Sequence, residues 1–299
     1  MSERPYYTQQ SSFTDPGEYA TVWDQVEPTP PAMKAAIQPL LFHYRAHGDY
    51  AENGIAPERI TEADLRYSGD MLARINEMEP IVPGQQRNPS HRMVGCCRDW
   101  ALLFVSLARH HGFAARSRVG FANYFADGWW IDHTIAEVWD EREQRWRLVD
   151  SELPDGFKPA SGEAFEPIDI PRDRFLPGLD AWRLVRSGEL LADPFVVAPE
   201  IEIPELRGIP YLWHNVVQDL AALNRHEMVL WDVWGIDLEP VNDQGAMLLD
   251  MVAASKTLAE WQQHFAREEF SVPAQVLSFS PANPESPMEV TLRLPGRQA

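Results

Sequence analysis

The sequence predicts an α+β fold, in which one amphipathic helix packs on a short antiparallel sheet and further helices are added at both ends. Three observations predict it. Residues 97–112 carry apolar side chains at intervals of three and four and end at a glycine, which is typical of a helix. The following stretch, 114–150, holds three segments rich in β-branched and aromatic residues. Helical spacing of apolar residues recurs before and after this unit.

The N-terminal third is expected to lead into that unit through an arm and two helices. Residues 1–30 are polar and end among prolines, so we expect an irregular arm. The stretch "AMKAAIQPLLFHYRAHG", residues 32–48, predicts a helix that is kinked near Pro39. Residues 61–78 predict a second helix. Residues 79–95 are dense in Pro, Gly, Asn and Ser and predict a loop.

Three strands and a helical region are expected after the central helix. The strands are "AARSRVGFANYF" and then "HTIAEVWD" and "RWRLVD", the last two joined by the polar turn "EREQ". A Pro-rich connector follows, and the remaining chain is mainly helical with at most one short strand at its end. We therefore divide the chain into the arm at 1–30, a core with its N-terminal helices at 31–155, and a mainly helical extension packed on the core at 156–299.

The composition and net charge indicate which classes of partner and which cellular location to expect. The chain carries 45 acidic and 26 basic residues, a net charge of −19, which repels phosphate backbones and anionic headgroups. We expect neither nucleic acid nor a membrane as partner, and no apolar run approaches the roughly 20 residues of a membrane span. The first residues lack the apolar region of a secretory signal, and we expect a cytoplasmic location. The sequence indicates no oligomeric state.

The chain has two cysteines, Cys96 and Cys97, and they are adjacent. Consecutive Cα atoms lie about 3.8 Å apart, which is below the usual disulfide range of about 4.4–6.8 Å. A thiolate zinc site needs about three or four convergent ligands, so we predict no metal and no cofactor. Two interpretations remain. The pair consists of small buried hydrophobic residues, or one of the two is a nucleophile.

A base and an orienting carboxylate are available for a nucleophilic cysteine. The helix start offers free N–H groups and the positive end of the helix dipole, which favour a thiolate. His133 opens one strand and Asp150 ends the next. If Trp139 pairs with Trp146 across the turn, His133 becomes a diagonal neighbour of Asp150 on the same face. A register slip of one residue would turn Asp150 to the other face.

These motifs resemble the transglutaminase-like superfamily of papain-like cysteine enzymes, over about residues 90–152. The matching residues of the nucleophile, His and Asp motifs are Gly95, Cys97, Arg98, Asp99, Trp100, Ala101, Arg109, Gly112, Phe113, Ala115, Arg116, His133, Glu137, Val138, Trp146 and Asp150. The resemblance implies a papain/transglutaminase-like catalytic core within residues 31–155. It also implies that Cys97 is the nucleophile, His133 the general base and Asp150 the residue that orients the base. Cys96 would then be a packing residue.

The chain departs from the family pattern in two places. Ile135 stands two residues after the His, where the family commonly has an aromatic residue. Ser151 and Glu152 follow the Asp, where Pro-Thr is usual. Neither departure removes a catalytic group, and both leave the substrate class open.

Candidates for the rest of the site come from the surrounding segments. The backbone N–H of Cys97 is one expected oxyanion donor, and the side-chain donor is expected among His91, Arg92, Trp129 and Trp130. Tyr124, Trp129 and Trp130, together with Phe125, are candidates to line a cleft for an acyl substrate. The alternative for these aromatic residues is a packing interface with the C-terminal region.

The expected function is that of a thiol enzyme. It would form an acyl-enzyme at Cys97 and then hydrolyse or transfer an acyl group taken from an amide, ester or thioester. Its substrate is expected to be a small molecule, a peptide or a carrier-bound acyl group. The competing hypothesis is a non-catalytic binding or assembly module with the same fold.

Overall fold

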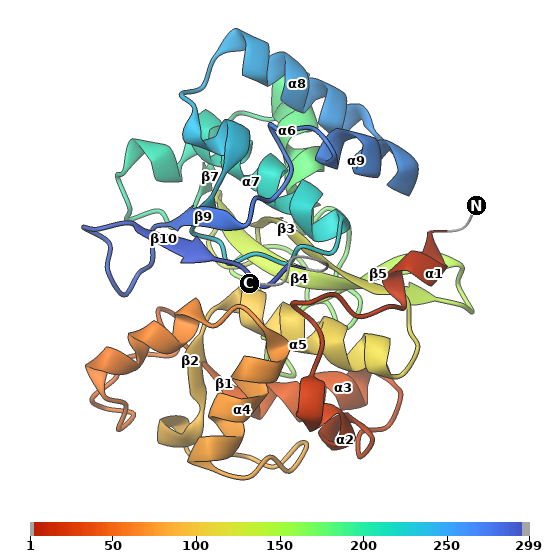
Figure 1. The fold of residues 1–299 in the computed structure, drawn as a ribbon, viewed down its shortest axis with the longest axis vertical. Coiled ribbons are helices and arrows are strands. Elements are labelled where there is room, and N and C mark those ends of the chain that lie inside the picture. The colour runs from red at the N-terminus through yellow and green to blue at the C-terminus, as the bar shows by residue number, and fades with distance from the viewer. Residues whose placement is uncertain (1–2, 295–299) are drawn as a thin grey trace.

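The structure is a computed structural model that describes residues 3–294, and its fold is α+β as predicted (Figure 1). The helices are α1 (Arg4–Tyr7), α2 (Ala20–Trp23), α3 (Pro30–Ile37), α4 (Ser68–Met78), α5 (Cys97–His110), α6 (Gly178–Arg186), α7 (Gly208–Leu223), α8 (Asp243–Ala254) and α9 (Leu258–Phe265). The strands are β1 (Leu41–His43), β2 (Met93–Gly95), β3 (Ala115–Ala122), β4 (Trp130–Asp140), β5 (Arg145–Val149), β6 (Phe175–Pro177), β7 (Phe195–Val196), β8 (Asp232–Val233), β9 (Gln275–Ser278) and β10 (Met288–Thr291).

The central sheet contains the three predicted strands and two short additions from later in the chain. Its order is β5-β4-β3-β6, all antiparallel, and β7 pairs in parallel with the start of β4. Trp139 pairs with Trp146, as the register argument required. At the close crossing of β3 and β6, a Cβ on Gly120 would lie 2.1 Å from the carbonyl oxygen of Leu176, so only glycine fits there.

Helices cover both faces of this sheet. Helix α5 packs on β3 and β4 from one side, and α6 and α7 pack on β3 from the other, with α8 and α9 outside them (Figure 1). All eight residues of β3 are buried for this reason, including Arg116 and Arg118. Each guanidinium is paired: Arg118 with Asp219 of α7 and Arg116 with Glu137 of β4. The sheet is thus held between two helical layers by apolar packing and by buried ion pairs.

Two predicted N-terminal helices are shorter than expected. Helix α3 ends at Ile37, and after one turn of 3-10 helix the chain enters β1, where the sequence predicted a kinked helix through residue 48. Pro39 lacks an N–H and disfavours helix at the residue before it, and Leu41 and Phe42 are buried instead against other elements. In the second segment, residues 57–64 form a 3-10 helix and the α-helix begins only at Ser68.

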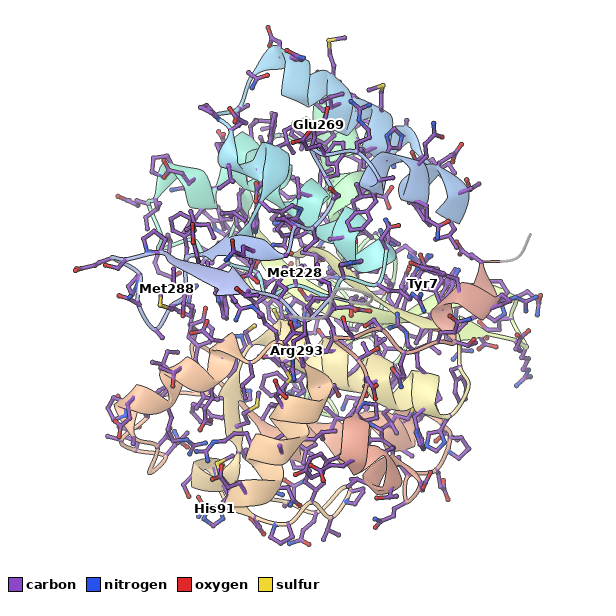
Figure 2. All side chains as sticks on the ribbon, in the orientation of Figure 1. Tyr7, His91, Met228, Glu269, Met288 and Arg293 are labelled. Atoms are coloured by element: carbon purple, nitrogen blue, oxygen red, sulfur yellow. The ribbon has the colours of Figure 1, made fainter. Side chains whose placement is uncertain are left out.

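The N-terminal segment packs against the rest of the protein. The segment predicted as an irregular arm contains the single-turn helices α1 and α2, and its side chains Tyr7, Phe13 and Trp23 are fully buried. The Tyr7 hydroxyl donates to the carbonyl of Leu223 at the end of α7, with 2.8 Å between the oxygens. Side chains from all parts of the chain fill the interior, and Met228, labelled near the middle of the view in Figure 2, is buried among them. Within residues 3–294 no helix has the length and apolarity needed to cross a membrane.

Candidate active site

The start of α5 is a rigid turn that places Cys97 at the first helical position. Cys96 is the extended N-cap residue, and its N–H donates to Oδ2 of Asp99 over 2.9 Å. A Cβ on Gly95 would lie 2.5 Å from that same oxygen, which explains the glycine. The Cys97 side chain is buried, with 5% exposed, and its backbone N–H has no hydrogen-bond partner within residues 3–294.

The sheet brings His133 and Asp150 into direct contact. Nε2 of His133 lies 2.7 Å from Oδ2 of Asp150, and both residues are buried. The Tyr124 hydroxyl donates to the same Oδ2 over 2.7 Å, and the backbone N–H of Glu152 donates to Oδ1 over 3.1 Å. The aspartate is therefore held from both sides, and the diagonal pairing that the sequence allowed is the one observed.

The contact between His133 and Asp150 shifts the pKa values of both residues. Burial acts to lower the pKa of His133, but the Asp150 carboxylate and its hydrogen bond outweigh it and raise that pKa above the ordinary value. Burial acts to raise the pKa of Asp150, and His133 and Tyr124 hold it below its ordinary range. Because Nε2 faces Asp150, Nδ1 is the nitrogen left to exchange a proton elsewhere.

The Cys97 thiol has a pKa well above its ordinary value, which is opposite to the direction expected at a helix start. Interaction with the adjacent Cys96 thiol, burial, and the nearby carboxyl groups of Glu152 and Asp132 all act to raise it. These effects outweigh the helix dipole, which is a local and smaller contribution. The resting Cys97 thiol is therefore protonated, and it would need a base in order to react as a nucleophile.

The start of α5 lies near the His133–Asp150 pair. The Ser151 hydroxyl, next to Asp150, donates to the carbonyl of Trp100 in the first turn of α5 over 3.1 Å. Cys97 interacts with Tyr124, the tyrosine that donates to Asp150, and with Asp132, the neighbour of His133 in β4. Helix α5 itself packs on β4. The helix that bears Cys97 and the His133–Asp150 pair are thus neighbours, and the catalytic roles of the three residues that the motifs singled out remain predictions.

Glu152 is a buried acid that sequence analysis noted only as a departure from the family pattern. Its side chain is 10% exposed, and its Oε2 is buried without a hydrogen-bond partner in the described part of the chain. Burial raises the pKa of Glu152 to about 8, assisted by the charges of Asp150 and Asp99 and opposed by His133. The carboxyl is therefore neutral at neutral pH.

We expect Glu152→Gln to gain stability relative to the unsubstituted protein as the pH rises. In the folded chain the carboxyl keeps its proton up to about pH 8, whereas in the unfolded chain it loses it near 4.5. The stability due to the neutral form is present below about pH 4.5 and is lost as the pH rises toward 8. The difference in free energy of unfolding between variant and parent should grow by roughly 2–4 kcal/mol across this window.

Urea unfolding at several pH values between 5 and 8 measures this difference. Glu58→Gln, at an exposed position of the chain, is the matched control and should show no such trend. Parallel pH profiles for Glu152→Gln and the parent would show that the Glu152 carboxyl is ionised in the folded protein.

The predicted substrate-binding aromatics take different positions. Tyr124 is fully buried and packs edge-on against His133, so it supports the His133–Asp150 pair and does not line an open cleft. Phe125 is the exposed aromatic neighbour, 38% exposed, with its ring centroid 4.9 Å from that of His133. Trp130 is partly buried and stacks on Phe195 at 5.7 Å, and Trp129 is partly buried in the preceding loop. A substrate-binding role for the two tryptophans remains a prediction.

The candidate oxyanion donors from the loop are occupied elsewhere. His91 is exposed and its Nδ1 lies 3.1 Å from Oε2 of Glu79. The Arg92 guanidinium donates to the carbonyl of Arg87 over 3.0 Å. Sequence analysis missed His43, which it placed inside a helix. The structure puts His43 at the end of β1, where it pairs with Gly95, two residues before Cys97.

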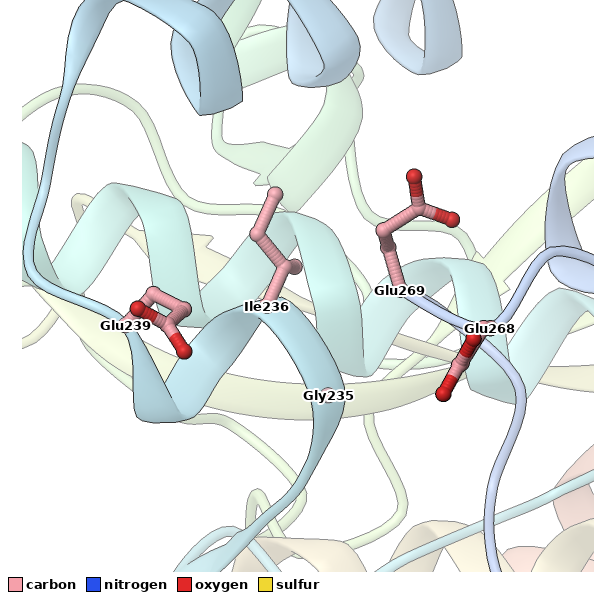
Figure 3. A pocket seen from close by; sticks show the side chains of 5 residues that line it. All are labelled: Gly235, Ile236, Glu239, Glu268 and Glu269. Carbon is pink, nitrogen blue, oxygen red and sulfur yellow. The ribbon is translucent and has the colours of Figure 1, made fainter.

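A surface hollow on the C-terminal side of the molecule lies apart from this site. Figure 3 shows its lining, and none of the lining residues is a predicted site residue: Gly235, Ile236, Glu239, Glu268 and Glu269. The carboxylate of Glu269 there is already paired with Arg267 at 2.9 Å. Within residues 3–294 no three His, Cys, Asp or Glu side chains gather as a metal ion would require.

Comparison with known proteins supports the motif assignment. Residues 82–151 match the family model described as the transglutaminase-like superfamily, and this segment contains Cys97, His133 and Asp150. The match confirms the predicted resemblance over that segment and supports a cysteine enzyme as the broad class. No curated protein matches the chain. A solved structure of a proposed cysteine protease from Cytophaga hutchinsonii aligns with 14% identity and a TM-score of 0.33, covering 51% of this chain and 43% of that one.

Proposed function

We propose that this chain is a thiol enzyme that forms an acyl-enzyme at Cys97, with His133 as general base and Asp150 as the residue that orients it. The observation that carries the proposal is the buried contact of 2.7 Å between His133 and Asp150, close to the first turn of the helix that bears the thiol, where Ser151 donates to the carbonyl of Trp100. A buried imidazole with a raised pKa and one free nitrogen is the form that a general base requires.

The reaction begins with a proton transfer, because the resting thiol is protonated. Nδ1 of His133 takes the Sγ proton as Sγ attacks the substrate carbonyl carbon, and the carbonyl π electrons move onto oxygen. The tetrahedral intermediate then collapses. The C–S thioester remains, and the leaving group departs with the proton held by His133. Asp150 accepts the hydrogen bond from Nε2 throughout and stabilises the imidazolium without itself taking the proton.

The second half of the reaction is attack on the thioester by water or by an amine. Water gives hydrolysis and an amine gives acyl transfer, and the choice follows from which of them reaches the thioester first. The proposed acyl donor is a small molecule, a peptide or a carrier-bound acyl group bearing an amide, ester or thioester. The buried thiol requires that the acyl group be narrow at the reacting carbon.

We expect an acyl group to be trapped on Cys97 and not on Cys96. The full chain is incubated with p-nitrophenyl acetate, quenched in acid and mapped by mass spectrometry, and the release of p-nitrophenol is followed in parallel. Alkylation by iodoacetamide should also favour Cys97, and its rate should rise with pH because the thiol pKa is raised.

Cys96→Ser is the control, because serine preserves the N-cap position and should keep most of the acylation rate. Cys97→Ser should lose the adduct. An adduct on Cys96, or a chain that never acylates, would overturn the proposal, and the latter result would favour the binding or assembly module.

A further inference from the structure

We propose that His43 is the side-chain oxyanion donor of this site, and that its Nε2–H and the backbone N–H of Cys97 together bind the oxygen of the tetrahedral intermediate. The inference rests on the proposed function, since it assigns a role in acyl transfer at Cys97. It concerns a residue outside the segment that matches the family model.

The fold brings His43 to the nucleophile turn. Strand β1 pairs in parallel with β2, so that His43 is the partner of Gly95, and the N–H of Tyr44 donates to the Gly95 carbonyl over 3.0 Å. Cys97 follows Gly95 by two residues. The His43 ring also stacks on Trp100 in the first turn of α5, with centroids 6.2 Å apart and planes 17° from parallel. The imidazole is thus fixed against both elements that hold Cys97.

The hydrogen bonds of the ring decide which nitrogen carries the proton. Nδ1 accepts from the backbone N–H of Arg45 over 3.1 Å and from that of Ala46 over 3.2 Å. Two donors directed at Nδ1 require a lone pair there, so the proton of the neutral ring is on Nε2. Nε2–H is therefore a donor of defined direction on a ring that cannot rotate without losing both bonds.

The charge state suits a donor that keeps its proton. Burial, the neighbouring His47 and His133, and the Arg45 guanidinium lower the pKa of His43 to about 3. The Glu152 carboxyl lies near Nε2 of His43 and is itself held neutral by burial. A neutral imidazole stabilises a developing negative charge by a hydrogen bond and leaves the proton transfers to His133.

Nε2 of His43 has no hydrogen-bond partner among the described residues, and Oε1 of Glu152 lies 4.0 Å away, beyond hydrogen-bond distance. Glu152 lies beside this nitrogen, and the ring of His43 stacks on Trp100 in the first turn of the helix that bears Cys97, so the Nε2–H donor lies near the start of that helix. During attack the carbonyl π pair moves onto oxygen and is held by the two N–H groups. On collapse it re-forms the C=O bond, and His43 neither gains nor loses a proton.

The test separates acyl transfer from simple alkylation of the same thiol. Attack on p-nitrophenyl acetate passes through an oxyanion, whereas displacement on iodoacetamide does not, so an oxyanion donor affects the first rate alone. We expect His43→Leu and His43→Ala to lower single-turnover acylation by about 10²- to 10³-fold and to change alkylation by less than about threefold. His43→Gln retains an N–H donor and should recover part of the acylation rate.

His47→Ala is the matched control, because His47 also packs on Trp100 and its Nδ1 accepts from the backbone N–H of His43. The acylation rate of His47→Ala should lie within a few-fold of that of the parent. Equal loss of acylation and alkylation in His43→Leu, or equal acylation by His43→Leu and His43→Gln, would overturn the assignment. Leucine fills the ring's place, so this comparison holds even when His43→Ala does not fold. A parent chain that is alkylated at Cys97 yet never acylated would instead overturn the proposed function.

Discussion

His133→Ala will lower the rate of acylation at Cys97 by a larger factor than any other single substitution that leaves the thiol in place. The Cys97 thiol is protonated at rest because its interaction with Cys96, burial and neighbouring acids raise its pKa, so its activation depends on a base. General bases contribute about 10²- to 10⁴-fold, and we expect a loss in the upper part of that range. Asp150→Asn should lose a smaller factor, because Tyr124 and Phe125 still pack against the His133 ring.

The pH dependence of acylation distinguishes these roles. His133 acts as a base only when neutral, and its pKa lies above the ordinary 6.5, so acylation should rise with pH through a limb above that value. Asp150→Asn removes the carboxylate that raises this pKa and should move the limb to lower pH. The measurement is single-turnover acylation against pH for the parent and both variants.

Asp132→Asn and Glu137→Gln are the comparisons for Asp150→Asn. Glu137 is engaged in ion pairs with three arginines, Arg116, Arg118 and Arg172, so its loss should affect stability more than the pH profile. Asp132 lies beside His133 and near the thiol. If the acylation rate of Asp150→Asn equalled that of the parent while the acylation rate of Asp132→Asn collapsed, the orienting role would belong to Asp132.

Asp219→Ala will destabilise the fold far more than the loss of an exposed carboxylate. Asp219 on α7 is fully buried and binds Arg118 of β3 through two hydrogen bonds of 2.8 Å each. It also accepts from the backbone N–H of Val119 over 3.3 Å. Removing the carboxylate leaves a buried guanidinium with one fewer counter-charge, which costs about 3–5 kcal/mol.

The free energy of unfolding in urea measures this cost. Glu269→Ala removes a partner of the same kind of pair on the surface, where Arg267 and Glu269 are each more than a third exposed, and it should cost about 0–1 kcal/mol. Similar losses in the two variants would mean that Arg118 finds compensation in Glu137, its other acidic partner. Such a result would remove the Asp219 pair as the main link between α7 and the sheet.

Local signals in the sequence were sufficient for the elements that form the centre of the fold. The apolar spacing after Cys97 predicts α5, and the β-branched segments predict β3, β4 and β5, because these patterns depend on residues a few positions apart. The register of β4 on β5 also followed from a local feature, a short turn flanked by Trp139 and Trp146. That register brought His133 to Asp150.

The elements that were predicted wrongly depend on distant partners. Residues 41–43 are a strand because β2, about fifty residues later in the chain, pairs with them, and no periodicity within residues 32–48 reveals it. The same pairing brings His43 to Gly95, two residues before Cys97, so no local pattern could identify the proposed oxyanion donor. Strands β6 and β7 likewise exist only as edges on β3 and β4.

By itself, the sequence determined which side chains are candidates for the chemistry and the α+β order of the elements that bear them, since motif spacing and periodicity are properties of neighbouring residues. The tertiary structure alone decided the electrostatics of the site. A cysteine at a helix start favours a thiolate by the helix dipole, yet burial beside Cys96, Glu152 and Asp132 raises the Cys97 pKa. Desolvation depends on every element that packs around a group, and those elements come from all parts of the chain.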